Sequence, residues 1–243
     1  MNRRLAIALV SSAAFAPTLA AAQQMQMPMP TPTPAKISPM PTAAEQPFIA
    51  KLQQEIPRRY ATIDAAKKAG YFQYTPEDST GAISYVNLKV WNSSDLTIPN
   101  QLWYDVNGRL LGVDYTLLKS TSPAIPDTLF GYKIEPGHWT QHGDHMHWGF
   151  KMPDGTLKLG VTRLDAFKAA GGDPNPTQGD VPANKAALVK VGISGLTSPD
   201  QVQFIFLHPA MWDLVVWVLP NPDGAFADAN PNVKPSAARA GGM

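Results

Sequence analysis

The chain has 243 residues and carries 20 basic against 19 acidic side chains, a net charge of +1. This balance excludes the strong positive charge that is typical of proteins that bind nucleic acid or anionic membranes. The sequence contains no cysteine, which excludes disulfides, thiolate metal sites and cysteine nucleophiles.

Residues 1–22 have the three parts of a cleaved secretory signal peptide. Arg3 and Arg4 supply the positive start, Leu5–Phe15 is an apolar run, and Ala20–Ala22 offers a small-residue cleavage site. A membrane anchor is the alternative, but a span needs roughly 20 apolar residues and this run is shorter. Cleavage removes Arg3 and Arg4 from the 20 basic residues, which leaves 18 against 19 acidic ones. We therefore expect a soluble, secreted or periplasmic protein with no membrane span and no nucleic-acid partner.

Residues 23–46 are rich in proline, methionine, threonine and glutamine. Such a segment buries too little apolar surface to offset the entropy of ordering it, so we predict a disordered linker. Met25, Met27, Met29 and Met40 lie in this segment, and thioethers are soft ligands that suit Cu(I). Compositional bias of a linker is the simpler explanation of the same methionines.

A single α+β globular domain is predicted over residues 47–235, followed by a disordered tail at residues 236–243. An N-terminal helical segment is indicated by apolar residues at i, i+3 and i+4 spacing, which are Phe48, Ile49, Leu52 and Ile56. Pro57 is expected to interrupt this helix, because proline has no backbone N–H. A second helix is expected to run from about Ala61 to Lys68.

The rest of the domain is predicted to be an antiparallel β-sheet with several hairpins and a few short flanking helices. Asn107-Gly108 is the strongest turn signal, since both residues tolerate positive φ, and it joins strands at Gln101–Val106 and Arg109–Leu117. Pro153-Asp154-Gly155 marks a second hairpin. The further predicted elements are strands at Ile83–Trp91, Leu129–Ile134, Asp144–Met152, Thr156–Thr162, Val202–Leu207 and Met211–Leu219, and helices at Arg163–Ala170 (capped by Thr162) and Asn184–Val191. The last two strands are apolar and β-branched, which favours a central place in the sheet.

Four of the five histidines lie within ten residues, at His138, His142, His145 and His147. His145 and His147 are two residues apart on a predicted strand, so their side chains share one face. The opposite face is apolar, with Met146, Trp148 and Phe150. Two imidazoles at this spacing can bind one divalent transition metal, which we predict to be zinc or copper. The alternative is a solvated or interface strand whose histidines bond to neighbours or water.

Further ligands are expected from outside this strand. His138 and His142 belong to the predicted preceding loop and can fold back onto the ion. Asp144 is the candidate catalytic base or outer-shell group. His208 lies at the junction of the two apolar strands, where it can deliver a further ligand while Asp213 fixes its tautomer. A turn histidine held by the following proline is the alternative for His208.

His145-Met146-His147-Trp148-Gly149 is similar to the H-x-H-W-G strand motif of α-type carbonic anhydrases. These are secreted zinc enzymes in which both histidines bind the metal, so the resemblance implies a zinc-binding role for His145 and His147. The match covers five residues of 243, and the downstream region expected to hold the family's third zinc histidine, Phe167–Asp173, contains no histidine. The motif therefore indicates a shared strand geometry and not membership of the family.

These observations predict an exported protein with a histidine metal site, either a metal-dependent hydrolase or hydratase or a copper- or zinc-binding protein. One alternative is a non-catalytic periplasmic domain that binds a small-molecule ligand or a partner, and another is a structural envelope protein. Aromatic and acidic residues around the first hairpin can line a ligand cavity, namely Trp103, Tyr104, Asp105, Asp114 and Tyr115.

Overall fold

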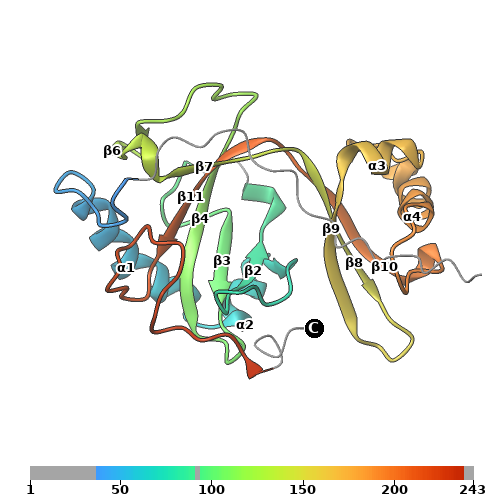
Figure 1. Cartoon of the computed structure of the whole chain (residues 1–243), viewed down its shortest axis with the longest axis horizontal. Coiled ribbons are helices and arrows are strands. Elements are labelled where there is room, and N and C mark those ends of the chain that lie inside the picture. Colours follow the sequence, from blue (N-terminus) through green and yellow to red (C-terminus); the bar gives the residue numbers. More distant parts are fainter. Residues whose placement is uncertain (1–36, 91–93, 238–243) are drawn as a thin grey trace, which may run out of the picture.

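The computed structural model describes residues 37–90 and 94–237 of the chain. Its antiparallel sheets and few short helices confirm the predicted α+β class. Figure 1 shows two lobes: a six-stranded sheet with α1 (Gln46–Tyr60) on its outer side, and a three-stranded sheet with α3 (Leu164–Ala169) and α4 (Val181–Lys190). The predicted signal peptide and most of the predicted linker lie outside the described residues. Within the described ranges, no helix has the length and apolar character needed to cross a membrane.

The larger sheet consists of β1 (Phe72–Gln73), β2 (Ile83–Val86), β3 (Gln101–Tyr104), β4 (Leu110–Leu118), β7 (Trp139–His142) and β11 (Met211–Trp217). Its strand order is β1-β2-β3-β4-β11-β7, and every neighbouring pair is antiparallel. The hairpin predicted at Asn107-Gly108 is confirmed, since it joins β3 and β4 with Gly108 at a φ of 78°. Side chains alternate across the sheet, so one face is apolar and lies under α1 while the other faces the smaller lobe.

Helix α1 covers the apolar face because its own apolar residues repeat at helical spacing. Its buried residues are Phe48, Ile49, Leu52, Ile56 and Tyr60, and they belong to the main hydrophobic core. Pro57 lies inside α1, so the prediction that it interrupts the helix is wrong. Ile56 and Tyr60 pack the last turn against the sheet. This packing offsets the loss of the backbone hydrogen bond that proline cannot donate. The next helix, α2 (Ile63–Lys68), has Thr62 as its N-cap.

The smaller sheet consists of β8 (His145–Lys151), β9 (Leu157–Arg163) and β10 (Val202–His208), in the order β10-β8-β9. The hairpin predicted around Pro153-Asp154-Gly155 joins β8 and β9. One face of β8 is apolar as predicted, since Met146, Trp148 and Phe150 pack into clusters with residues of α3 and α4. The histidine face of β8 consequently points toward the larger lobe, where the ring of His147 meets a tyrosine beside β1.

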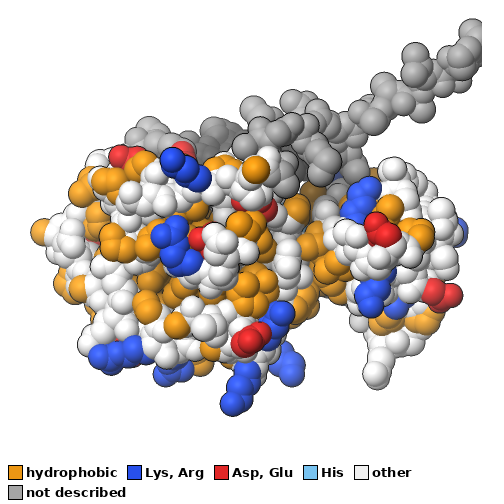
Figure 2. Space-filling model, turned by 90° about the horizontal axis from the view of Figure 1, so that it is seen from below, with side chains coloured by type: hydrophobic (Ala, Val, Ile, Leu, Met, Phe, Trp, Pro, Cys, Tyr) orange, Lys and Arg blue, Asp and Glu red, His pale blue; other side chains and the backbone are white. Residues whose placement is uncertain are grey.

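Two strands run through both lobes and bend where the sheets meet (Figure 1). β7 continues into β8 across Gly143-Asp144, and β10 continues into β11 after an equally short bend. The two strands stay paired on both sides of the bend, with Met211 opposite His142 in the larger sheet and His208 opposite His145 in the smaller one. Seen from below, the lobes meet at a waist where hydrophobic side chains are visible (Figure 2). The bend therefore fixes how the histidine-rich segment sits between the lobes.

The predicted strand Leu129–Ile134 is instead a small hairpin. Its arms are β5 (Thr128–Leu129) and β6 (Tyr132–Lys133). Phe130 and Gly131 both have positive φ, which reverses the chain between them.

Four other predictions differ from the structure. β2 ends at Val86 and is followed by a 3₁₀ helix, η1 (Leu88–Val90). The segment before β8 is the strand β7 and not a loop, because it pairs with β11. β10 is an edge strand, since it pairs only with β8, and its half-buried apolar residues pack against the ring of Phe72 and helix α4. The N-cap of α3 is Arg163 and not Thr162, which is still paired within the sheet. The remaining 3₁₀ helices are η2 (Pro136–His138), η3 (Gln178–Asp180) and η4 (Pro199–Gln201).

The described part of the predicted linker, residues 37–46, lies against the domain. The carbonyl of Pro39 accepts a hydrogen bond from the backbone N–H of Phe226 at 3.1 Å. Glu45 is fully buried just before α1. Ordered contacts therefore begin earlier than residue 47, the predicted start of the domain.

Candidate metal centre

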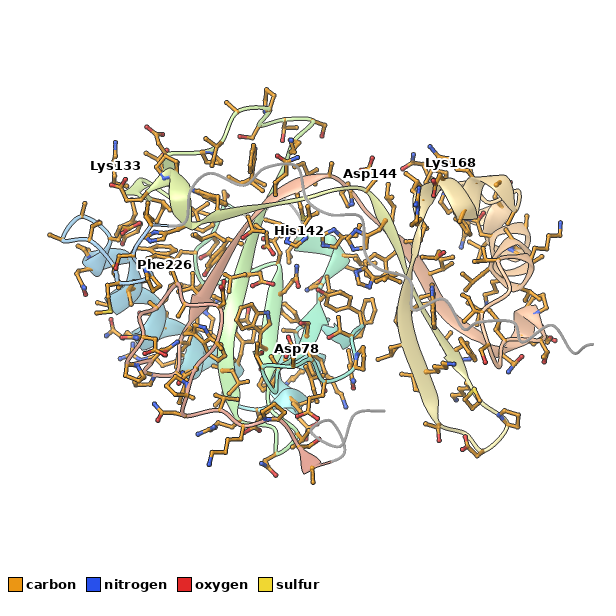
Figure 3. All side chains as sticks on the ribbon, in the orientation of Figure 1. Asp78, Lys133, His142, Asp144, Lys168 and Phe226 are labelled. Carbon is orange, nitrogen blue, oxygen red and sulfur yellow. The ribbon has the colours of Figure 1, made fainter. Side chains whose placement is uncertain are left out.

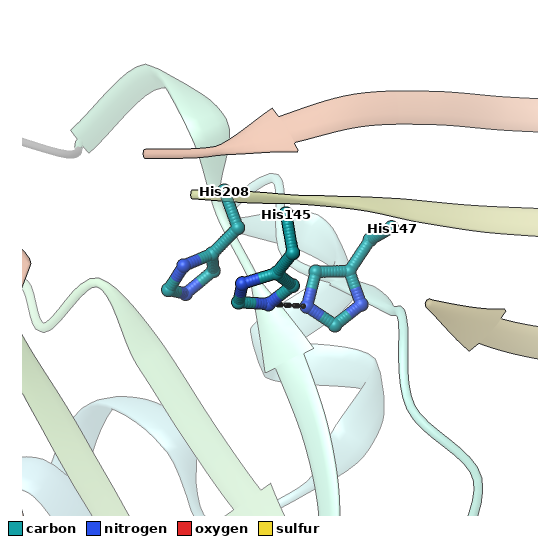
Figure 4. A group of neighbouring side chains, drawn as sticks. All are labelled: His145, His147 and His208. Carbon is teal, nitrogen blue, oxygen red and sulfur yellow. Dashed lines mark hydrogen bonds between the residues drawn. The ribbon is translucent and has the colours of Figure 1, made fainter. Parts of the chain in front are cut away.

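Three histidines lie together at the bend between the lobes (Figure 4). His145 and His147 are two residues apart on β8, so their side chains share one face. His208 is the last residue of β10. Antiparallel pairing sets His208 opposite His145 and Phe206 opposite His147. All three imidazoles therefore project from the same face of the smaller sheet.

In this histidine cluster (His145, His147 and His208), one ring nitrogen of each residue lies within 4.8 Å of the others. The Nε2 atoms of His145 and His147 are 3.0 Å apart, and the rings of His145 and His208 are stacked with centroids 4.5 Å apart. Two nitrogens bound to one tetrahedral Zn²⁺ lie about 3.3 Å apart, given Zn–N distances near 2.0–2.1 Å. His145 and His147 are thus spaced like two ligands of one ion, and His208 has a nitrogen near enough to be a third.

The tautomer of His145 follows from the hydrogen bond that its Nδ1 makes. Its Nδ1 lies 2.9 Å from the carbonyl oxygen of Gly143, which can only accept a hydrogen bond. Nδ1 therefore carries the proton, and the lone pair of Nε2 is directed toward His147. Metal-binding histidines are commonly oriented by this kind of hydrogen bond from the second nitrogen to a carbonyl.

Burial keeps the cluster uncharged. His147 and His208 are 6% and 4% exposed. Burial lowers the pKa of both well below the usual value, and the neighbouring histidines lower it further. Burial also lowers the pKa of His145, although the Gly143 carbonyl acts in the opposite direction. Neutral imidazole is the form that binds metal, so little proton release opposes binding near neutral pH.

A histidine–carboxylate pair lies beside the cluster. Nε2 of His142, on β7, is 3.4 Å from Oδ2 of Asp213, on β11. The ring of His142 lies 6.1 Å from that of His208. Burial lowers the pKa of His142, but the hydrogen bond and charge of Asp213 outweigh it, so the pKa is raised overall. Asp213 was expected to orient His208. In the structure, its carboxylate contacts His142.

Asp144, the predicted catalytic residue, is exposed at the bend (Figure 3). Its Oδ1 accepts a hydrogen bond from the backbone N–H of Ala210 at 2.6 Å. This contact joins the two strands at the point where they pass between the lobes. The buried carboxylate that contacts the histidine beside the cluster is instead that of Asp213.

His138 is not brought into the cluster. Its Nδ1 lies 2.8 Å from Oε1 of Glu45, and its Nε2 lies 3.0 Å from the carbonyl of Ser38. Its ring stacks on Phe226 with centroids 3.9 Å apart. Both ring nitrogens are engaged, so this geometry gives no support to the prediction that His138 is a metal ligand.

The cluster lines a pocket of about 740 Å³ between the lobes. Trp103 and Asp114, predicted to line a ligand cavity, are part of its wall. Tyr104 and Tyr115 were predicted there too, but they lie on the opposite face of the sheet and pack in the core under α1. Asp105 holds the β3–β4 turn, where its side chain accepts backbone hydrogen bonds. Strand alternation therefore divides the predicted set between two faces.

Tyr74 and Gln101 complete the pocket wall and were not predicted. The ring of Tyr74 meets that of His147 edge-on at 4.6 Å, and its hydroxyl donates a hydrogen bond to Oε1 of Gln101. Gln101 is 2% exposed. A polar residue at the head of an otherwise apolar strand was the only sequence signal for this contact.

Comparisons with known proteins identify no relative. No protein-family model matches the chain, and neither the curated proteins nor the solved structures yield a match. The functional argument therefore depends on the geometry of the site alone.

Proposed function

We propose that the protein is an exported metalloenzyme in which His145, His147 and His208 hold a zinc-like ion that activates water. The observation that carries the proposal is the convergence of three neutral imidazoles, from two adjacent strands, on the wall of a pocket. Catalytic zinc sites are typically built from three protein ligands and an open position, whereas structural sites are closed by four. An ion bound there would lower the pKa of a water molecule and favour hydrolysis or hydration.

His142 and Asp213 support this reaction class. A histidine paired with a buried carboxylate is a common proton acceptor, because the carboxylate orients the ring and stabilises its protonated form. His142 has that partner at 3.4 Å and lies on the wall of the same pocket as the cluster. We assign it the role of moving a proton between the ion's open position and solvent.

Export is part of the proposal and is supported by the signal-peptide pattern of residues 1–22. A site of three imidazoles also suits an oxidising compartment, because it has no thiolate ligand to lose.

A copper-handling role is the second candidate, favoured by one contact. Ile37 and Pro39 line the pocket, so the segment that carries Met25, Met27 and Met29 joins the described chain at the pocket wall. Soft thioether ligands next to an imidazole site would suit transfer of copper.

The first test is the metal content of the untagged protein, purified from the exported fraction without chelators. We expect about one equivalent of zinc, none in a His145→Ala/His147→Ala variant, and an unchanged content in His138→Gln, which alters a histidine outside the cluster. Hydrolysis of p-nitrophenyl acetate and hydration of CO₂ would then be assayed with the metal-loaded protein.

Each outcome selects one function. One equivalent of copper without activity would favour the second candidate. Substoichiometric metal that is equal in all three proteins and not restored by added ions would refute both, and would leave the non-catalytic binding domain.

A further inference from the structure

The pocket beside the histidine cluster is acidic. Its described lining includes four carboxylates, those of Asp78, Asp114, Asp213 and Asp228, and no lysine or arginine. A pocket lined by one sign of charge concentrates ligands of the opposite sign and repels those of its own. Anionic substrates are therefore disfavoured, and a cationic group or a set of hydrogen-bond donors is favoured.

Asp114 is a buried carboxylate of this lining whose described partners include no imidazole, unlike Asp213. It is 5% exposed, and its Oδ2 accepts a hydrogen bond from Nε1 of Trp103 at 3.1 Å. Its Oδ1 is buried and accepts no hydrogen bond from any residue that the structure describes. Asp213 also has a buried Oδ1 that accepts no hydrogen bond from any described residue, but its Oδ2 has the imidazole of His142. Burial and the neighbouring charge of Asp213 raise the pKa of Asp114 well above its usual value. A cationic donor from a ligand would favour the ionised form, so Asp114 is set up to receive one.

The location of Asp114 connects it with the histidine cluster. It pairs with Gln101 across β3 and β4, so the two side chains share the pocket face. Gln101 bonds to the hydroxyl of Tyr74, whose ring contacts His147. Asp114 and the cluster are thus two parts of one pocket wall with Tyr74 and Gln101 between them.

We propose that the pocket binds small organic molecules that carry a primary ammonium group, with the ammonium on Oδ1 of Asp114. The rest of the molecule then lies along the pocket toward the histidine cluster. That this part undergoes the reaction rests on the proposed function, whereas recognition of the ammonium group does not.

The experiment measures binding of three compounds that share one ring: benzylamine, benzyl alcohol and benzoate. Titrations at pH 7 use calorimetry on the full chain after removal of metal, because amines and carboxylates can themselves bind zinc. Asp114→Asn removes the ability to ionise beside an ammonium group but keeps an oxygen that can accept from Trp103. Asp105→Asn is the matched control, because it alters a buried carboxylate of the same hairpin outside the pocket.

We expect benzylamine to bind, benzyl alcohol to bind about tenfold more weakly, and benzoate not to bind. Asp114→Asn should weaken benzylamine binding by about tenfold or more while zinc content stays unchanged, and Asp105→Asn should do neither. Equal binding of benzoate, no binding of benzylamine, or an unchanged affinity in Asp114→Asn would overturn the proposal. Loss of zinc in Asp114→Asn with benzylamine affinity retained would also overturn it, and would assign Asp114 to the metal site. Binding of benzylamine by a wild-type protein that contains no metal as purified and takes none up when ions are added would refute the proposed function and leave this inference standing.

Discussion

Two buried histidine environments stand side by side in this molecule. His138 has a partner for each ring nitrogen, and the carboxylate partner, Glu45, is itself fully buried. In the histidine cluster, Nε2 of His145 instead lies 3.0 Å from Nε2 of His147, and with Nδ1 of His145 protonated it accepts a hydrogen bond from that nitrogen. Nδ1 of His147 is buried without a hydrogen bond to any described residue.

The difference separates a histidine whose ring nitrogens are both bonded to protein groups from a histidine cluster that can hold a metal ion. The pKa of Glu45 is raised by its burial, but hydrogen bonds from Glu135, Thr42 and His138 outweigh this and hold the pKa below its usual range. That site is complete and has no capacity for a ligand. The cluster gathers several electron-pair donors without a cation, which is the arrangement that a metal ion completes. The following experiments either sharpen or break this contrast.

The largest expected effect is stabilisation by metal. Zinc at about 100 times its dissociation constant should stabilise the folded protein by about 2.7 kcal/mol, which is roughly 5–10 °C in Tm for a chain of this size. His208→Ala should abolish the shift, whereas His138→Gln should retain it. Differential scanning fluorimetry with and without zinc measures both. Retention of the full shift in His208→Ala would mean that His208 is not a ligand.

The second expected effect is a loss of stability in a His138 variant with no change in metal content. His138→Ala removes one hydrogen-bond partner of buried Glu45 and a ring stacked on Phe226, so we expect a cost of about 1–3 kcal/mol. Urea unfolding measures the cost, and zinc content should stay at the wild-type level. A His138→Ala variant that keeps full stability and loses zinc would break the contrast.

The third effect is a pH dependence that separates the two environments. Since burial holds the pKa of His147 and His208 below the unfolded value of about 6.5, the unfolded metal-free chain takes up protons first as the pH falls. The free energy of unfolding should therefore fall below pH 6.5, by up to about 1.4 kcal/mol per pH unit for each histidine. His142 has a raised pKa and contributes in the opposite sense.

Urea unfolding of the metal-free protein between pH 7.5 and 5.5 measures this slope. His147→Leu should reduce it, and an unchanged slope would contradict the assignment. Glu45, whose pKa is lowered from 4.5, contributes stability that is complete above that value and is lost only as the pH falls below it. Glu45→Gln should therefore leave the slope between pH 7.5 and 5.5 unchanged.

The smallest effect is expected for Asp144. Its hydrogen bond to Ala210 is exposed, so Asp144→Asn should cost about 1 kcal/mol or less and change hydrolysis by no more than about twofold.

Asp213→Asn removes the partner of His142 and should reduce kcat by about 100-fold. Measuring kcat of both metal-loaded variants decides which of the two carboxylates acts in the reaction. A large loss of kcat in Asp144→Asn alone would restore the catalytic role predicted for it from the sequence.

Local patterns predicted much of this fold. The hairpin at Asn107-Gly108 and the alternation that puts His145 and His147 on one face depend on neighbours in the sequence, and both are confirmed. The continuation of α1 through Pro57 was not predictable in this way, because packing against the sheet decides it.

The site was predictable only in part, for the same reason. His208 was foreseen as a ligand at a strand junction, but only the register of β10 against β8 sets it opposite His145. The place of Asp213 beside His142, and of Tyr74 beside His147, depends on contacts between strands that are distant in the sequence. His138 lies in the same ten-residue run of histidines as His142, but Glu45, the residue before α1, holds its ring away from the cluster.

The pairing of β8 with β10 has a consequence for the order of events during folding. Its contacts join residues far apart in the chain, and contacts of this kind form late because the intervening loop must close first. Until they form, His145 and His147 are the two members of the proposed ligand set that are close in sequence, and a pair of imidazoles favours Cu²⁺ over Zn²⁺. The third member joins them only after β10 has docked. If the cluster binds metal as we propose, the ion would therefore depend on which metals are available where the chain folds.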